Sequence, residues 1–333
     1  MTADCTMLTV TQELFEQLEP DWTALAEHLP RPLPFHSPAW HRAWWSHFGN
    51  GRTPIYLAVR EDGVLAGVVP LMQDRTTLAV AGDPEICDYT DLPITAANPV
   101  SLLPCVLDAV DRLPWQTFHL WGLPEESPAL AATRAWGDAR GYGTEMDFEA
   151  VCPRVTLAGD WETYLSGLSK KDRHELKRKM RRFTEAGAEV GLRVLCAPED
   201  VVAALPAFFE LHRVSRHDKA EFMTPQMEAF FREMTVALAG EGLARIYLIE
   251  VDTKPAAALI AFRSGDELLL YNSGYDPAFS HASVGIVSKA MTLQSAIEDG
   301  VRTYDFLRGA EPYKYDLGGQ DRIVRQLWVR RDA

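Results

Sequence analysis

Apolar and polar residues follow their clearest pattern in the C-terminal third of the chain. Short apolar runs over residues 268–273 and 303–307 predict two strands. Between them, apolar residues recur at steps of four, three and four from Ile286 to Ile297, which is the spacing of one face of a helix. The pattern therefore predicts a strand, a loop, a helix over residues 285–299 and a second strand.

The start of this predicted helix is suited to binding an anion. Ser283 or Val284 lies at its first turn, and Gly300 stands where a left-handed residue would end it. The first N–H groups of a helix have no acceptor within the helix and point outward, so they attract a phosphate or an oxyanion. An anion site is therefore expected where the loop enters the helix.

The N-terminal half contains a similar order of patterns. The segments 54–59 and 245–250 share the letters Ile-Tyr-Leu, and a turn and a second apolar strand follow each of them. The segments 117–120 and 303–306 form a second matching pair, so the two offsets are 191 and 186 residues. Two matches at nearly the same offset predict a duplicated domain. The two domains are then residues 1–150 and residues 151–333.

A strongly basic segment occurs in an otherwise acidic chain, whose net charge is −14. Eight lysines and arginines lie between Lys170 and Arg182, and Leu176, Met180 and Phe183 supply the apolar face of a helix. A solvated surface helix is one interpretation. The other is a contact for an anion, either the phosphates of coenzyme A or an RNA.

Composition narrows the class of protein. The 333 residues are 47% hydrophobic, which is enough for the cores of two domains. The five cysteines show no Cys-x-x-Cys spacing and the nine histidines are isolated, so no metal site is expected. No apolar run reaches the roughly 18–20 residues of a membrane helix and no signal peptide is visible, so a cytoplasmic protein is expected.

The C-terminal pattern resembles the Gcn5-related N-acetyltransferase (GNAT) superfamily, in particular its FemABX-like branch and the CelD-type acyltransferases. The residues that carry the resemblance are Tyr271-x-x-Gly274-Tyr275, Gly285, Gly300, Tyr304-Asp305-Phe306-Leu307-Arg308-Gly309 and Pro312-Tyr313-Lys314. The resemblance implies an α+β (mixed α/β) fold of two tandem GNAT-like domains, each a mostly antiparallel mixed sheet flanked by helices. It also implies a degenerate N-terminal domain, because no glycine-led helix follows the third strand there.

The resemblance places an acyl donor in the C-terminal domain, between two strands that separate at one end. In GNAT proteins the loop before the helix holds the donor's pyrophosphate with the pattern Gln/Arg-x-x-Gly-x-Gly/Ala. Here the segment 282–287 keeps one glycine and lacks the Gln/Arg. The residues expected to bind the donor, acyl-CoA or aminoacyl-tRNA, are Ser273, Gly274, Ser283, Val284, Gly285 and Ile286.

Lys314 is the first candidate for catalysis. The resemblance places its Tyr-Lys pair where donor and acceptor meet, and a fixed ammonium there can stabilise an oxyanion or hold a phosphate. The alternative is a surface lysine in a loop. We expect Lys314→Ala to abolish transfer without changing the melting temperature.

Other side chains complete the predicted site. Packing is the alternative for the tyrosines, a structural hydrogen bond is the alternative for Asp305, and a solvated surface position is the alternative for Glu250 and Arg216. Tyr313, Asp305 and Glu250 are the further candidates for catalysis, with Glu250 as a base for the amine. The residues expected to contact the acceptor are Tyr271, Tyr275, Arg216 and Arg308.

Three functions are compatible with these patterns. The first is transfer of an acyl group from acyl-CoA to an amine (or hydroxyl) of a small molecule or cell-envelope precursor. The second is aminoacyl transfer of the FemABX type, with a tRNA bound through residues 170–182. The third is a non-catalytic GNAT-like pair that binds a partner in polysaccharide assembly. A monomer or a homodimer is expected in each case.

Overall fold

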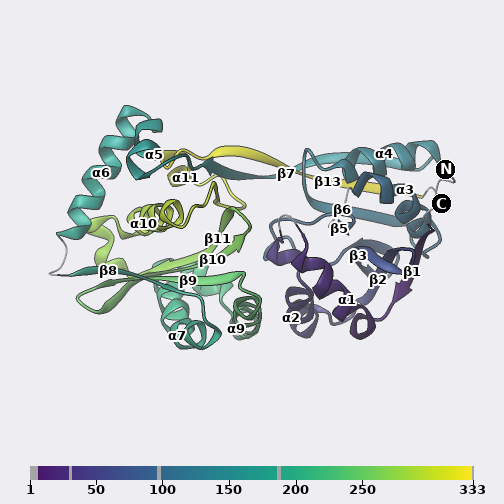
Figure 1. Cartoon of the computed structure of the whole chain (residues 1–333), viewed down its shortest axis with the longest axis horizontal. Helices are drawn as coiled ribbons and strands as arrows, with labels where there is room; N and C mark the ends of the chain where they lie inside the picture. The colour runs from purple at the N-terminus through teal and green to yellow at the C-terminus, as the bar shows by residue number, and fades with distance from the viewer. Residues whose placement is uncertain (1–6, 30–31, 96–98, 186–188, 332–333) are drawn as a thin grey trace, which may run out of the picture. The chain divides into compact units, whose positions relative to one another are not determined.

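The computed structural model describes residues 7–29, 32–95, 99–185 and 189–331 (Figure 1). By their contacts, residues 1–150 and 322–333 form one unit, and Val151–Asp321 forms the other. The sequence assigned residues 322–333 to the second domain, whereas the structure groups them with the first unit.

Unit 1 is a mixed sheet with helices on its faces. Its elements are β1 (Leu8–Glu13), α1 (Phe15–Glu27), η1 (Pro34–His36), α2 (Pro38–Phe48), β2 (Thr53–Glu61), β3 (Val64–Asp74), β4 (Thr77–Val80), β5 (Ile94–Thr95), α3 (Pro99–Asp111), β6 (Thr117–Pro124) and α4 (Pro128–Ala139). Strands β1 to β4 pair antiparallel in chain order, and β6 pairs parallel to β4.

Unit 2 repeats this order of strands. Its elements are α5 (Trp161–Gly167), α6 (Lys170–Thr184), β8 (Val190–Leu195), α7 (Pro198–Ser215), α8 (His217–Phe222), α9 (Pro225–Gly240), β9 (Ala244–Val251), β10 (Lys254–Ser264), β11 (Glu267–Tyr275), η2 (Pro277–Ala282), α10 (Val284–Glu298), β12 (Thr303–Asp305) and α11 (Pro312–Asp316). Strands β8 to β11 pair antiparallel and β12 pairs parallel to β11. The predicted fold class, a mostly antiparallel mixed sheet flanked by helices in two copies, is confirmed.

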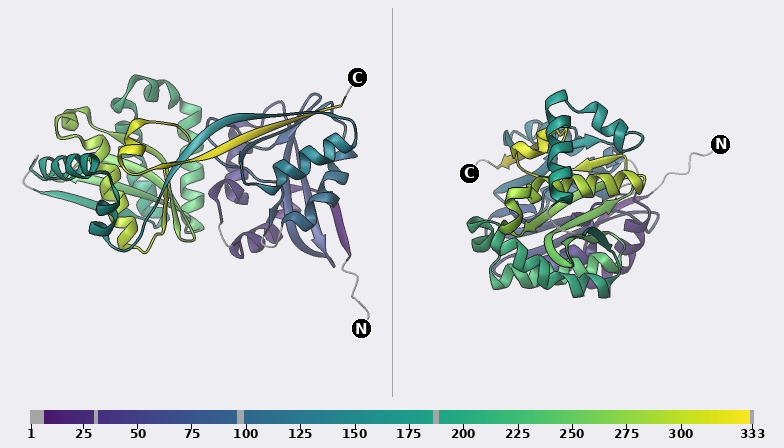
Figure 2. Two further views of the ribbon diagram at one scale, coloured as in Figure 1. Left: turned by 90° about the horizontal axis from the view of Figure 1, so that it is seen from above. Right: turned by 90° about the vertical axis from the view of Figure 1, so that its left-hand side faces the viewer.

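Two long strands, β7 (Gly143–Thr156) and β13 (Gln320–Arg330), each begin in one unit and end in the other (Figure 2). In unit 2, the end of β7 pairs antiparallel with β12. In unit 1, β13 pairs antiparallel with β6, which is why the end of the chain belongs there. Strand β7 therefore ends in the sheet of unit 2, and strand β13 ends in the sheet of unit 1.

The helices of unit 2 cover both faces of its sheet. Helices α7 and α9 pack on one face, and α10 packs on the other, against β10 and β11 (Figure 1). The core between α10 and the sheet includes Val287, Ala290 and Leu293, each at most 1% exposed. No helix in the described part of the chain has the length and apolar character that a membrane span requires.

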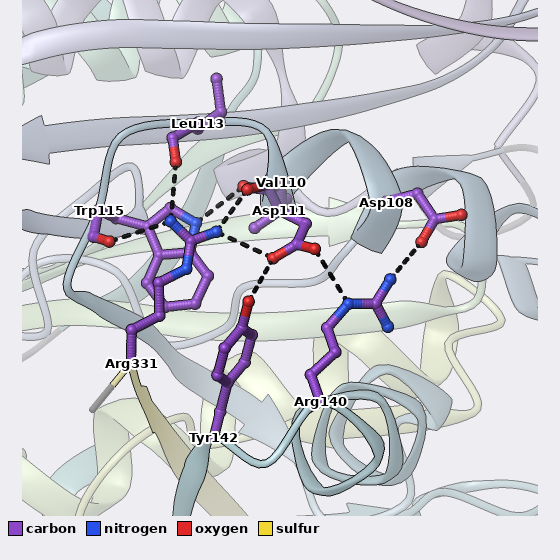
Figure 3. A network of polar contacts seen from close by, with 8 residues as sticks. All are labelled: Asp108, Val110, Asp111, Leu113, Trp115, Arg140, Tyr142 and Arg331. Atoms are coloured by element: carbon purple, nitrogen blue, oxygen red, sulfur yellow. Dashed lines mark hydrogen bonds and ion pairs between the residues drawn. The ribbon is translucent and has the colours of Figure 1, made fainter. Parts of the chain in front are cut away.

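The end of the chain is anchored in unit 1 by a network around Asp111 (Figure 3). Arg331 donates to the Asp111 carboxylate at 2.9 Å and to the carbonyls of Leu113 and Trp115 at 3.2 Å. Its guanidinium lies 3.8 Å from the centroid of the Trp115 ring. Tyr142 also donates to Asp111, at 2.8 Å. One side chain thereby connects the last strand to α3 and to the loop that follows it.

We predict that Arg331→Ala lowers the free energy of unfolding by about 2 kcal/mol, because several charge-assisted hydrogen bonds are lost and Asp111 keeps fewer donors. Urea denaturation of the full chain measures this change. The neighbouring Arg330→Ala is the matched control, since its ion pair with Glu145 is about half exposed and should contribute less than about 1 kcal/mol. Equal effects of the two substitutions would contradict the anchoring role.

Candidate active site

Strands β11 and β12 are hydrogen-bonded over a short length only. They pair at three positions, from Glu267↔Thr303 to Leu269↔Asp305. The chain after β12 then turns to the other side, where Phe306 N–H donates to Pro153 O at 2.9 Å. Strand β11 continues to Tyr275, paired with β10 alone. The two strands therefore separate after Leu269, which is the arrangement that the resemblance implied.

A β-bulge lies on β11 just beyond this point. The register with β10 changes from Ala261↔Leu270 to Ile260↔Asn272, so Tyr271 is the extra residue. Bulges redirect side chains and interrupt the ladder, and they are frequent beside active sites. The Tyr271 ring packs between Phe231 and Phe262, at centroid distances of 5.4 and 4.7 Å. Tyr271 therefore serves the packing of α9 on the sheet.

Helix α10 starts next to the end of β11. Ser283 precedes it in the left-handed conformation (φ 63°) and gives no side-chain cap to the first turn. The N–H groups of Val284 and Gly285 have no acceptor within the helix, as at any helix start. A Cβ at Gly285 would lie 3.4 Å from the Tyr275 ring. Tyr275 therefore borders the predicted anion site, while Ile286 is half-buried in the core side of the same turn.

The basic helix α6 packs against η2 and α10. Ser169 caps it by accepting from the Asp172 N–H at 3.1 Å, and Leu176 and Phe183 form its buried face. Among the eight basic side chains, those with an acidic partner in the described chain are Lys177, Arg178 and Lys179. The remaining five, with no ion pair to the described residues, leave positive charge beside the elements that lead into α10.

Gly274 has a packing role that the sequence did not reveal. A Cβ at this position would lie 2.2 Å from His212 N, so α7 contacts the backbone of β11 directly. The neighbouring Ser273 carbonyl accepts a hydrogen bond from Lys219 Nζ. His212 is 1% exposed, and burial lowers its pKa to about 4, so this ring is neutral.

Lys314 lies in the interior, with 1% of its surface exposed. Its Nζ donates to the carbonyls of Leu307 (3.0 Å), Arg308 (2.8 Å) and Gly309 (2.9 Å), and it pairs with Glu311 at 2.9 Å. An ammonium has three N–H donors, and these acceptors occupy them. The lysine therefore fixes the loop after β12, and the alternative of an exposed loop lysine does not apply.

The other residues around this loop are also held by local contacts. Asp305 is 1% exposed and accepts from the Leu307 N–H at 2.7 Å, where Leu307 has a φ of 55°. The carbonyl of Arg308 is one of the acceptors of Lys314. Tyr313 packs edge-on against Phe306 at 6.2 Å, and burial raises its pKa, so its hydroxyl stays protonated at neutral pH. These contacts fix the conformation of the loop next to the point where β11 and β12 separate.

Two predicted residues lie apart from this group. Glu250 is on β9, with β10 between it and β11, and its carboxylate is 3.6 Å from Arg193. Arg216 is exposed between α7 and α8 and pairs with Asp218 at 2.7 Å.

Sequence reasoning missed two lysines near the end of β11. Lys289 of α10 is 5% exposed, and Lys219 of α8 reaches Ser273. Burial lowers the pKa of Lys289 to about 7 and that of Lys219 to about 8. The available signal was a lysine at a helix position four residues after Gly285, among small and apolar neighbours. Among the described residues, no group of three or more His, Cys, Asp or Glu could hold a metal ion.

We predict that Lys314→Met lowers the free energy of unfolding by about 3 kcal/mol, because three buried carbonyls and a carboxylate lose their donor. This replaces the expectation of an unchanged melting temperature. Urea denaturation measures the change, with the exposed Lys254→Met as control. A variant as stable as the control would rule out the structural role of Lys314.

We predict that the effect of Lys289→Met on the free energy of unfolding depends on pH. An unfolded lysine has a pKa of about 10.4, so between about pH 7 and pH 10 the unfolded chain holds a proton that folded Lys289 has released. The free energy of unfolding therefore rises with pH in the wild type, and this rise is smaller in the variant. Denaturation at pH 6 and pH 9 tests it. A variant that is less stable than the wild type by the same amount at both values would contradict the lowered pKa.

Comparison with known proteins finds a family match for part of the chain. Residues 170–315 match the family described as Acetyltransferase (GNAT) domain, which supports acyl transfer in general. No curated protein matched the sequence.

Solved structures with little sequence identity share the fold. The crystal structure of FemX has 12% identity and a TM-score of 0.65, with 96% of each chain covered. The C-terminal domain of a putative lysylphosphatidylglycerol synthetase from Agrobacterium fabrum has 10% identity and a TM-score of 0.60, with 96% of this chain and 92% of that chain covered. A tandem GNAT protein from the clavulanic acid biosynthesis pathway has 15% identity and a TM-score of 0.50, with 98% and 100% covered. Residues 170–315 therefore match the acetyltransferase (GNAT) domain family, and the chain as a whole shares its fold with FemX and with the tandem GNAT protein.

Proposed function

We propose that the protein transfers an acyl group from acyl-CoA to an amine, or a hydroxyl, of a small molecule or cell-envelope precursor. The observation that carries this proposal is the separation of β11 from β12 after Leu269, which leaves β11 without a partner strand on that side up to Tyr275, where α10 starts. Backbone groups on the free side of β11 can bind an extended acyl donor, because that side has no partner strand there.

The donor phosphates fit the start of α10. The N–H groups of Val284 and Gly285 and the helix dipole attract negative charge. The five unpaired basic side chains of α6, which packs against η2 and α10, add a positive field at the same end. This arrangement compensates for the missing Gln/Arg of the usual pyrophosphate loop, and the pantetheine arm would run along β11 from Tyr275 towards Leu269.

The chemistry is the attack of a neutral amine on a thioester carbonyl. A C–N bond forms, the C–S bond breaks, the amine loses a proton, and the CoA thiolate leaves and gains one. We assign Tyr313 of α11, the helix that follows β12, as a hydrogen-bond donor to the leaving thiolate, because burial raises its pKa and its hydroxyl keeps its proton; the thiolate takes its final proton from solvent. We assign Lys314 as the positioning residue that keeps this loop away from β11.

We predict that Gly285→Asp lowers the affinity for acetyl-CoA at least tenfold. The carboxylate repels phosphate, yet an acidic residue in the first turn favours the helix, so the fold should be retained. A Cβ fits there at an ordinary contact distance of 3.4 Å from Tyr275. Thermal stabilisation by acetyl-CoA measures binding.

Gln226→Asp, in the first turn of α9, is the matched control and should bind acetyl-CoA normally. Acetyl-CoA stabilisation that is equal in Gly285→Asp and in this control would remove the proposed donor site.

Transfer from aminoacyl-tRNA is the second candidate, favoured by the unpaired charge of α6. A charged tRNA should then stabilise the protein in low salt, and the effect should fall steeply as salt rises. The triple substitution by glutamate of Lys171, Arg181 and Arg182, three of the five basic residues without an acidic partner among the described residues, should abolish this stabilisation. Acetyl-CoA stabilisation without any RNA effect selects the first function, and the reverse result selects the second.

A further inference from the structure

Two lysines that the proposed chemistry does not use lie beside the free part of β11. Lys219 extends from α8, and its Nζ donates to the Ser273 carbonyl of that strand. Lys289 extends from α10, and its Nζ lies 5.7 Å from the centroid of the Tyr313 ring. The two side chains come from different elements, and each is within electrostatic range of the other and of Glu311.

The charges around this pair do not balance. Glu311 is the acidic group that acts on both lysines, and its carboxylate already pairs with Lys314 at 2.9 Å. The other charges that act on Lys219 are Arg216 and Asp218, which pair with each other. Two ammonium groups therefore lie near each other, and the carboxylates that act on them, Glu311 and Asp218, are each paired with another cation.

Lys289 also has no hydrogen-bond acceptor within the described part of the chain. Among the described residues, its ammonium makes a cation–π contact with the Tyr313 ring and no ion pair, although just 5% of the surface of Lys289 is exposed. An ammonium that is mostly desolvated and has no protein acceptor is unfavourable for folding unless water or a bound anion accepts from it, and an anion does so more strongly than water. An anion with two oxygen atoms can accept from both lysines at once.

The lysine pair is separate from the donor phosphate site. Lys289 follows Gly285 by four residues, which is about 6 Å along a helix that rises about 1.5 Å per residue. It also contacts Tyr313 of α11, the helix that follows the loop after β12. The pair therefore lies along the proposed path of the donor's arm and beside Tyr313, the residue assigned to the leaving thiolate.

We propose that Lys219 and Lys289 bind an anionic group of the acyl acceptor, a carboxylate or a phosphate close to the amine that is acylated. The assignment of the bound anion to an acyl acceptor rests on the proposed function, whereas the anion site itself does not depend on it. The substrate class is then a small acidic amine, or the acidic end of a larger precursor.

Binding of the anion is tested first, without any acyl transfer. Propionate and inorganic phosphate are titrated separately into the full-length protein while the melting temperature is followed. At least one of them should raise it in the wild type and in the exposed control Lys254→Met. Propionate should not raise it in Lys289→Met or Lys219→Met, and phosphate should raise it less there than in the wild type, because the start of α10 can still bind phosphate. Lys219→Arg, which keeps the charge, should retain the full effect. Which of the two anions acts tells a carboxylate site from a phosphate site.

Selection of the acceptor is tested second, with acetyl-CoA and three matched amines: β-alanine, phosphoethanolamine and propylamine. Release of free CoA thiol should show a kcat/KM at least tenfold higher for one of the acidic amines than for propylamine. That preference should be lost in Lys289→Met. The lysine stability measurements at pH 6 and pH 9 establish that the variant is folded.

The two proposals fail in different ways. Stabilisation by an anion without any effect of acetyl-CoA would leave the lysine site in place and remove the proposed function. Two results would overturn the lysine site alone, provided that acetyl-CoA stabilises the protein. In one, propionate and phosphate stabilise the wild type and Lys289→Met equally; in the other, they stabilise neither protein. Equal turnover of acidic and neutral amines would also overturn it.

Discussion

The end of the β11–β12 ladder is the constraint on which the rest of the C-terminal unit depends. Two parallel strands continue to pair unless the chain of one is held elsewhere. Here the Lys314 ammonium donates hydrogen bonds to three carbonyls of the loop after β12. The Asp305 carboxylate accepts from the Leu307 N–H, and the Phe306 N–H donates to a carbonyl of β7. These contacts satisfy the loop without β11, so one side of β11 is left for a ligand.

The stability of the unit and its chemistry make opposite demands on charged side chains. Lys314 is buried with all of its donors satisfied, so it stabilises the fold around the site. Lys289 is buried without an acceptor in the described chain, so it costs stability at neutral pH. The same residue type therefore has two roles within one small region, and the hydrogen-bond partners distinguish them.

The local elements of this region could be predicted from the sequence, because helix and strand periodicity depend on neighbouring residues. The strand at residues 268–273 and the helix led by Gly285 occur as expected, and the strand expected at residues 303–307 occurs but ends at Asp305. Their long-range partners could not be predicted. The pattern at residues 303–307 predicts a strand, but it does not show that β7 is its neighbour. The burial of Lys314 depends on a loop with left-handed residues at Leu307 and Gly309, which no periodicity reveals. Lys289 was missed because the helix pattern was read from its apolar positions alone.

The central claim is that an acyl donor lies along the free side of β11 with its phosphates at the start of α10. Amide hydrogen exchange of the full chain, with and without saturating CoA, tests it most directly. The account predicts that added protection is concentrated at Val284 and Gly285 and in β11 beyond Leu269. Protection that appears only in unit 1, or binding of CoA that leaves these amides unchanged, would contradict it.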